Sequence, residues 1–298
     1  MDTRDLHRFV ERTEGMVSPR DVGRLYQRAE MLARLPVAIQ KVIVDRASGD
    51  DPSIGFVVEP YCFFLTYELT DVAAARRQLP PHYELVPAAI FDTTEARPCG
   101  IVGAFNIHTS VFWGSRVELY VIAEDQRSGM LSWIICDYES NTINYDPGQG
   151  FSGATTSRSV ITTTHRGEVL IDVAGASGTN RLATVASLEA ATMTPLEQRL
   201  WIEGNLSVDY GGRLMDPGSV PFGLVFDPDE MRQALQLPLD DVTVDENTFG
   251  ASFLAPEPFE AACFPYAQHF LTSSFPTEST IRDRTDLDDA VRQVLEAE

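Results

Sequence analysis

Hydrophobic and polar positions follow two different periodicities, which divide the chain near residue 50. Between Ser18 and Pro36, apolar residues recur at helical spacing, and Ser18 followed by Pro19 is a typical helix start. A second, shorter helix is predicted over residues 38–46, before a polar, turn-rich segment. From residue 54 onward, short runs rich in β-branched and aromatic residues indicate strands.

The predicted strands lie in six segments: residues 55–69, 100–113, 115–124, 130–138, 159–175 and 199–212. Turn residues at 126–129, 146–148 and 166–168 indicate consecutive hairpins. Further helices are predicted over residues 71–79, from residue 227 through 237, and over residues 286–297. The pattern predicts a mainly β (α+β), antiparallel fold with helical N- and C-terminal additions.

Composition narrows the class of protein. A chain of 298 residues that is 44% hydrophobic can bury a substantial core. No apolar run approaches the roughly 18 residues of a membrane span, and the charged N-terminus lacks a signal-peptide pattern, so we expect a cytoplasmic protein that does not bind membranes. The net charge of −21 disfavours nucleic-acid binding.

Metal and nucleotide cofactors are not expected. The four cysteines, Cys62, Cys99, Cys136 and Cys263, occur singly, and three of them lie in apolar, strand-like runs that are typical of buried thiols. No two histidines have the spacing of a local metal site, and no phosphate-binding glycine motif occurs. We therefore predict no metal and no cofactor.

The segment from residue 116 to 157 carries the most specific pattern. A strand with an internal acid at Glu118 precedes a strand that ends in Asp137-Tyr138, and a glycine-punctuated turn over residues 148–153 then leads into hydroxyl residues. Upstream, a strand and a short helix end in Leu79-Pro80-Pro81. This order resembles the acetoacetate decarboxylase-like superfamily over residues 54–275.

The resemblance implies a closed or cone-like β-barrel that encloses an apolar cavity suited to small molecules. Together with the helices predicted at both ends, it divides the chain into an N-terminal helical segment (1–52), an acetoacetate decarboxylase-like β domain (53–276) and a C-terminal helix (277–298). The family's decarboxylases carry a Schiff-base lysine directly after the glycine turn. Here residues 153–157 read Gly-Ala-Thr-Thr-Ser, and the chain has a single lysine, Lys41. We therefore expect a member that lacks the Schiff-base lysine.

Candidate catalytic residues are Glu118, His108 and Arg116. From the sequence alone, a solvent-facing Glu118 is favoured. The resemblance raises the alternative, because Glu118 matches an acidic, cavity-facing position of the family, where it would move protons. Arg116, or alternatively Arg97, would hold a carboxylate or an oxyanion. His108 alternates with apolar neighbours and would join Glu118, or be a structural histidine.

Candidate substrate-binding residues are aromatic or polar residues of the predicted strands and turns: Tyr120, Trp133, Tyr138, Ser152, Thr155, Thr156 and His269. The aromatic residues would line the cavity or fill the core. The threonines would bind a carbonyl in place of the missing lysine, or serve as β-branched residues at a strand start.

Three functions remain open. The first is an enzyme of small-molecule, including secondary, metabolism that performs lyase, hydratase or cyclase chemistry on a carbonyl-bearing or partly hydrophobic substrate. The second is a non-catalytic binding protein for a lipophilic small molecule. The third is an assembly role in which the helical ends join copies of the chain as a homo-oligomer.

Overall fold

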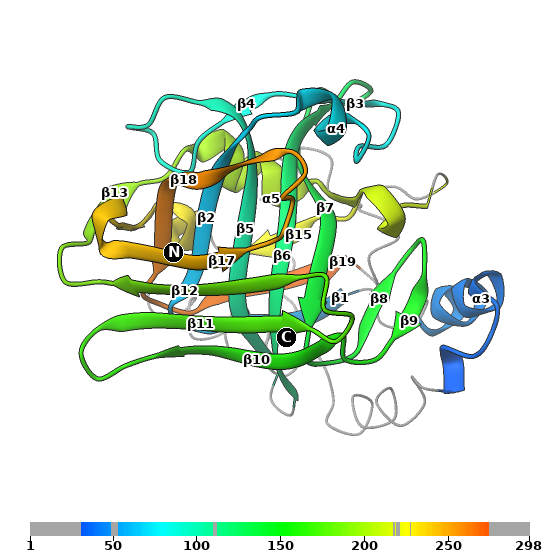
Figure 1. Cartoon of the computed structure of the whole chain (residues 1–298). Coiled ribbons are helices and arrows are strands. Elements are labelled where there is room, and N and C mark those ends of the chain that lie inside the picture. The colour runs from blue at the N-terminus through cyan, green and yellow to red at the C-terminus, as the bar shows by residue number, and fades with distance from the viewer. Residues whose placement is uncertain are drawn as a thin grey trace, which may run out of the picture.

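The computed structural model describes residues 31–48, 53–109, 112–216, 218, 221–226 and 228–273. Within them the protein is mainly β, with few helices and one large mixed sheet (Figure 1). The helices predicted before residue 31 and after residue 273 lie outside the described residues, so the proposed division at both ends stays a prediction.

The large sheet forms the centre of the molecule. Its main path runs through β13 (Thr192–Pro195), β16 (Gln233–Gln236), β18 (Leu254–Phe264), β2 (Cys62–Leu69), β5 (Arg97–Thr109), β1 (Ser53–Val58), β19 (Gln268–Ser273) and β15 (Leu224–Phe226). From β5 a branch continues through β6 (Phe112–Asp125) and β7 (Leu131–Ser140) to β14 (Val208–Tyr210). The β14–β7 pair is parallel, which makes the sheet mixed. Two short strands, β3 (Tyr83–Leu85) and β4 (Pro87–Ala88), pair with β6 and β5.

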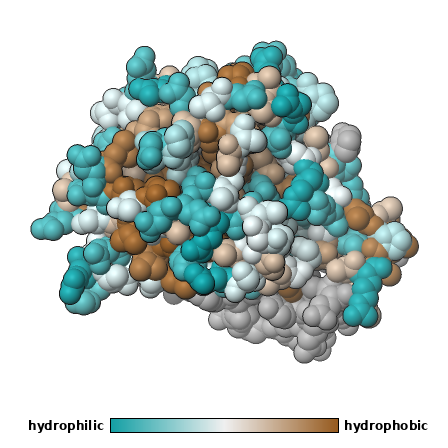
Figure 2. Space-filling model, viewed as in Figure 1, coloured by the Kyte–Doolittle hydropathy of each residue, from teal (hydrophilic) through white to brown (hydrophobic). Residues whose placement is uncertain are grey.

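A four-stranded antiparallel sheet covers one face of the large sheet (Figure 1). It consists of β10 (Thr156–Thr163), β11 (Glu168–Gly175), β12 (Arg181–Ser187) and β17 (Val242–Asn247). Alternate residues of β11, Val169, Ile171 and Val173, are buried against the large sheet, and we call this layer the packed core. Hydrophilic residues predominate on the face seen in Figure 2, which also shows several hydrophobic areas, with the largest on the left.

The predicted hairpins form where turn residues permit them. Gly167, between β10 and β11, has a φ of 79°, a conformation that glycine adopts without steric cost. The turn at residues 126–129 joins β6 to β7. β8 (Asn144–Asp146) pairs with β9 (Gly150–Ser152) around the turn predicted at residues 146–148.

Helix α3 (Val37–Ser48) confirms the second predicted helix and lies beside the β8–β9 hairpin (Figure 1). The buried Gln40 accepts a hydrogen bond from the backbone N–H of Phe151 at 2.7 Å. Gly150 has a φ of 76°, and a Cβ there would collide with the Gln40 side chain. The glycine turn therefore provides the surface on which α3 docks.

The strand predicted over residues 199–212 is wrong for most of its length. Residues Arg199–Glu203 form a π-helical turn (η1), Gly204–Leu206 continue as α5, and only β14 is extended. Glu197 stabilises the helical start because its carboxylate accepts a hydrogen bond from the backbone N–H of Leu200 at 2.6 Å. The free energy gained by burying Leu200 and Trp201 in the helical form outweighs the strand preference of these residues.

The helix predicted from residue 227 is also wrong beyond its first turn. A 3₁₀ turn, η3 (Pro228–Met231), gives way to β16, in which Leu235 is paired with Cys263 of β18. Pairing on both sides, with β13 and β18, favours the extended form. By contrast, the helix predicted over residues 71–79 is confirmed in shorter form as α4 (Val72–Arg76), with Asp71 as its N-cap.

The remaining described helical elements are single 3₁₀ turns: η2 (Gly212–Leu214) and η4 (Leu239–Asp241). No helix among the described residues has the length and apolar character needed to cross a membrane.

Candidate functional site

A cavity of about 270 Å³ lies on the face of the large sheet opposite the packed core. Residues of β1, β2, β5, β6, β7, β14, β15 and β19, together with η1 and α5, line it. β14 pairs with β7 on one side, and Val208 forms an antiparallel bridge with Phe222 just before β15. Since β15 pairs with β19 and β19 with β1, strand contacts continue around the cavity.

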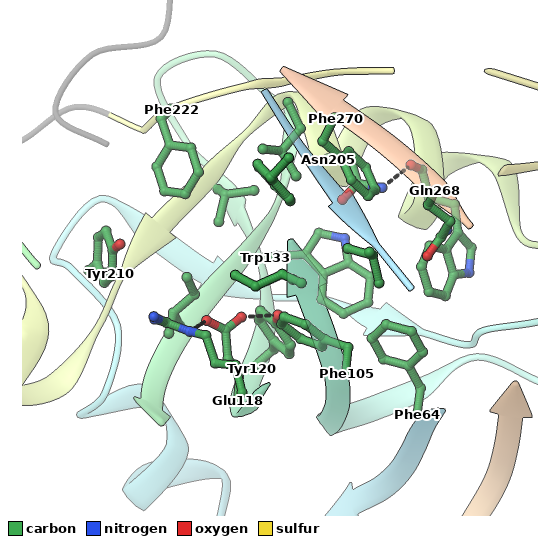
Figure 3. A pocket seen from close by; sticks show the side chains of 18 residues that line it. Phe64, Phe105, Glu118, Tyr120, Trp133, Asn205, Tyr210, Phe222, Gln268 and Phe270 are labelled. Atoms are coloured by element: carbon green, nitrogen blue, oxygen red, sulfur yellow. Dashed lines mark hydrogen bonds and ion pairs between the residues drawn. The ribbon is translucent and has the colours of Figure 1, made fainter. Parts of the chain in front are cut away.

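Aromatic residues make up half of the 18 residues that line the cavity (Figure 3). Trp201 lies between Phe64, at a centroid distance of 5.2 Å, and Trp133, at 5.3 Å. The indole N–H of Trp133 donates to the backbone oxygen of Leu200 at 3.0 Å, and that of Trp201 donates to the backbone oxygen of Ile90 at 3.1 Å. Both indoles are therefore held in place without using polar groups of the cavity.

A charged cluster interrupts this apolar wall. Arg116, Glu118 and Tyr120 alternate along β6, so all three side chains face the cavity (Figure 3). The Glu118 carboxylate is 5% exposed and accepts hydrogen bonds from Arg116 Nε and from the Tyr120 hydroxyl. The cluster therefore joins a carboxylate, a cation and a phenol in one network.

Arg116 is fixed by further contacts behind the cavity. One of its terminal nitrogens donates to Asn144 Oδ1 at 2.9 Å, and its guanidinium carbon lies 4.1 Å from the ring centre of Tyr138. The Tyr138 hydroxyl in turn donates to Asp146 at 3.1 Å. The second terminal nitrogen of Arg116 has no hydrogen-bond partner within the described part of the chain, so it can donate to a ligand.

Burial and charge set the protonation of these partners. Burial raises the pKa of Tyr120 well above its ordinary value, and the Glu118 carboxylate raises that pKa further. Burial alone would lower the pKa of Arg116, but the attraction of Glu118 and of the neighbouring phenols together outweighs it, and the pKa lies above the ordinary range. Burial also raises the pKa of Tyr138 to about 12. At neutral pH Arg116 is therefore charged, and both phenols keep their protons.

Two amide side chains that are not among the candidate residues predicted from the sequence also line the cavity: Asn205 of α5 and Gln268 of β19 (Figure 3). Gln268 accepts from the Cys62 thiol and donates to the Met231 sulfur, each at 3.3 Å. Asn205 donates to the backbone oxygen of Trp201 at 2.7 Å. The sequence could have indicated Gln268, because it lies two residues before Phe270 on a strand and so shares its face. Asn205 could not be found in this way, because its segment was wrongly predicted to be a strand.

Neither candidate histidine lines the cavity. On β5, His108 follows Ile107, which does, so its side chain points to the other side of the strand, and its Nδ1 is 3.4 Å from Glu59 Oε1. On β19, His269 lies between Gln268 and Phe270, which both line the cavity, and its Nδ1 is 2.7 Å from Glu230 Oε1. Each histidine is therefore paired with a glutamate on the opposite face of its strand from the cavity.

The predicted hydroxyl residues also lie away from the cavity lining. Ser152 belongs to the β8–β9 hairpin, and Thr155 Oγ1 accepts a hydrogen bond from the backbone N–H of Ser140 at 2.9 Å. Thr156 begins β10 of the four-stranded sheet, and its hydroxyl lies 3.4 Å from the backbone oxygen of Ser140. Thr155 and Thr156 therefore join the start of β10 to the end of β7 in the large sheet.

Two other basic residues lie outside the lining. Arg97 stacks over Phe259 at 5.0 Å and lies 3.6 Å from Glu68. Lys41 of α3 forms an ion pair with Asp216. Thus Arg116 is the cation that the described structure places in the cavity wall, together with Glu118, Tyr120 and Trp133 of the predicted site. The described residues contain no cluster of three or more His, Cys, Asp or Glu side chains that could hold a metal ion.

No protein-family model matches the chain, and no curated protein matches it in sequence. Eight chains of solved structures match it. Acetoacetate decarboxylase from Legionella pneumophila is 13% identical, with a TM-score of 0.42, over 79% of this chain and 94% of that chain. The enduracididine biosynthesis enzyme MppR with bound HEPES is 13% identical, with a TM-score of 0.42, over 74% and 85%. An acetoacetate decarboxylase-like enzyme from Sphingomonas wittichii RW1 is 10% identical, with a TM-score of 0.39, over 76% and 92%.

Proposed function

We propose that this protein is a small-molecule enzyme of the acetoacetate decarboxylase-like superfamily that performs acid/base chemistry on a carbonyl-bearing, partly hydrophobic substrate. The observation that carries the proposal is the convergence of Arg116, Glu118 and Tyr120 on one wall of an otherwise apolar cavity. A site built only to bind a lipophilic molecule gains nothing from burying a carboxylate and a guanidinium. The order of motifs from residue 79 to 157 supports the superfamily.

A closed or cone-like β structure is part of this proposal. The β14–β7 pair and the bridge between Val208 and Phe222 support it, because they connect the ends of the sheet around the cavity. Such an enclosure excludes water and strengthens the electrostatic interactions inside it.

The chemistry follows from the donors and acceptors that face the cavity. The substrate carbonyl accepts a hydrogen bond from the second terminal nitrogen of Arg116. Glu118 removes a proton from the adjacent carbon, and the electron pair of that C–H bond moves onto the carbonyl oxygen as an enolate. The charge of Arg116 stabilises the enolate, and the Tyr120 hydroxyl keeps the carboxyl group oriented. Lyase, hydratase and cyclisation reactions can all begin from this intermediate.

The proposed chemistry proceeds without an imine. The single lysine, Lys41, lies outside the cavity lining and is paired with Asp216. Borohydride treatment in the presence of pyruvate, acetoacetate or 4-phenyl-2-butanone should therefore leave the mass of the protein unchanged. A reduced adduct on Lys41 that disappears in Lys41→Arg would contradict this part of the proposal.

Exchange of α-protons tests proton abstraction before the natural substrate is known. The wild-type protein in D₂O, incubated with the same three carbonyl compounds, should accelerate deuterium incorporation into at least one of them, measured by ¹H NMR. Glu118→Gln should reduce this rate at least about 100-fold, because the base is lost while the side-chain volume is kept. Glu189→Gln, at an exposed position, is the matched control and should leave the rate unchanged.

A non-catalytic binding protein is the second candidate, favoured by the predominantly apolar cavity wall and by the absence of histidine among its described lining residues. It predicts tight binding of lipophilic compounds without exchange of any α-proton. Equal exchange rates for the wild type and Glu118→Gln would remove the acid/base role of Glu118 and leave the binding function.

A further inference from the structure

The cavity has a second polar end, formed by Asn205 and Gln268, that proton abstraction does not use (Figure 3). Both amides approach the sulfur of Met231, at 4.0 Å and 3.3 Å, which places them close together.

Aromatic rings separate this end from the charged cluster. Tyr120 contacts Trp133 at a centroid distance of 4.9 Å, and Trp133 contacts Trp201 at 5.3 Å. Asn205 is hydrogen-bonded to the backbone of Trp201. Two indoles therefore lie between the Tyr120–Glu118 network and the amide end, so the part of a ligand that spans this distance meets apolar rings.

The hydrogen bonds of Gln268 are poor for a group so deeply buried. The residue is 2% exposed, and both of its amide atoms have sulfur partners, which are weak donors and acceptors. A primary amide has two N–H donors and a carbonyl with two acceptor positions, and buried amides normally satisfy them with oxygen or nitrogen partners. Gln268 thus retains a donor capacity that the protein does not fill.

Asn205 complements it with an acceptor. Its Nδ2 is directed to the Trp201 carbonyl, whereas its Oδ1 accepts no hydrogen bond from any residue that the structure describes. The amide end therefore offers one acceptor and one donor, and a hydroxyl group can satisfy both at once because it donates and accepts.

We propose that Asn205 and Gln268 bind a hydroxyl group at the far end of the substrate. This inference rests on the proposed function, which assigns the carbonyl of the same molecule to Arg116 and Glu118. The substrate class is then a carbonyl compound with a flat apolar body and a distal hydroxyl group, of the kind that a phenol attached to a short ketone chain represents.

Three ligands of one skeleton test the proposal with the full chain: 4-phenyl-2-butanone, its 4-hydroxyphenyl analogue and its 4-methoxyphenyl analogue. Isothermal titration calorimetry should give about tenfold tighter binding for the hydroxyl compound than for the phenyl compound, as expected for one buried hydrogen-bonding group. The methoxy compound, which cannot donate to Asn205, should lose this gain.

Gln268→Met, of similar volume, should abolish the preference for the hydroxyl compound and leave affinity for the phenyl compound within about twofold. Gln126→Leu, at an exposed position, is the control and should preserve the preference. If Gln268→Met does not fold, Asn205→Leu and the three-ligand series on the wild type make the same comparison.

The outcomes separate this inference from the proposed function. Equal affinity for the three ligands, or a preference that survives Gln268→Met, overturns the role of the amide end. If α-proton exchange still depends on Glu118 in that case, the proposed function stands. If none of the three ligands binds, the hydroxyl-site proposal is overturned together with the substrate class.

Discussion

The two faces of the large sheet are built from the same strands but are filled in opposite ways. On β6, Arg116, Glu118 and Tyr120 face the cavity, whereas the residues between them join the packed core. On β7, Ile134 lies in the packed core and its neighbour Ile135 lines the cavity. Mostly aliphatic side chains fill the packed core, whereas the rings and charges of the cavity face leave an open space. One set of strands thus provides stability on one side and a binding site on the other.

The ion pair is the feature of the cavity face that should be most costly to break. Removing either partner leaves the other charge buried, so Glu118→Leu or Arg116→Met should each lower the free energy of unfolding by up to about 5 kcal/mol. The double variant should lose far less than the sum, because no unpaired charge remains. Urea unfolding followed by tryptophan fluorescence measures all three.

An exposed ion pair is the matched control for the single and double variants of Arg116 and Glu118. Arg199 and Glu124 are 46% and 29% exposed, and solvent screening should limit the effect of Glu124→Leu to less than about 1 kcal/mol. Equal costs for Glu118→Leu and Glu124→Leu would show that the cavity pair is as well solvated as a surface pair.

Ile134 and Ile135 allow the two faces to be compared with a single chemistry. Ile134→Ala should lower the free energy of unfolding by about 4 kcal/mol, because the packed core is left with a new cavity. Ile135→Ala should cost about half as much, because its side chain already borders an open space. Chemical denaturation of both variants gives the difference, and equal losses would mean that the cavity face is packed as tightly as the other.

The packed side carries a titratable group of its own, Asp209, whose side chain alternates with the cavity-lining residues of β14 and accepts from the Tyr83 hydroxyl at 3.1 Å. Burial raises the pKa of Asp209 from 3.8 to about 6. The folded protein therefore holds a proton that the unfolded chain releases, and stability from this group is present below pH 4 and is lost as the pH rises through about 6.

Asp209→Asn should remove this dependence. The free energy of unfolding of the wild type, relative to that of the variant, should fall between pH 4 and pH 7 by at most about 3 kcal/mol. Urea midpoints at closely spaced pH values measure it. A difference between wild type and variant that stays constant over this range would place the pKa of Asp209 near its ordinary value in the folded protein.

Strong local patterns made much of the sheet predictable. The β6 and β7 strands combine alternation with a glycine-containing turn at Gly129, and both were predicted. Alternation also places Arg116, Glu118 and Tyr120 on one face, but period alone does not say which face borders the cavity. That choice depends on the four-stranded sheet, which covers the opposite side.

Asn205 was not predicted from the sequence because tertiary contacts overrule the strand preference of its segment. Residues 199–206 have strand-like composition, yet Trp201 is buried among aromatic rings that come from distant strands. Glu197 carried the contrary signal, since an acidic side chain beside a helix N-terminus accepts hydrogen bonds from the first backbone N–H groups, as Glu197 does from Leu200. Similarly, the polar contacts of His108 and His269 with Glu59 and Glu230 depend on elements far apart in sequence.

Because Arg116 and Glu118 neutralise each other, the cavity is electrically neutral inside a chain with a net charge of −21. The surface field repels anions at a distance, while the interior holds no net charge to attract them. The cavity should therefore bind uncharged organic compounds more tightly than charged ones. Their affinity should change little with ionic strength, although the same salt strongly screens the exterior.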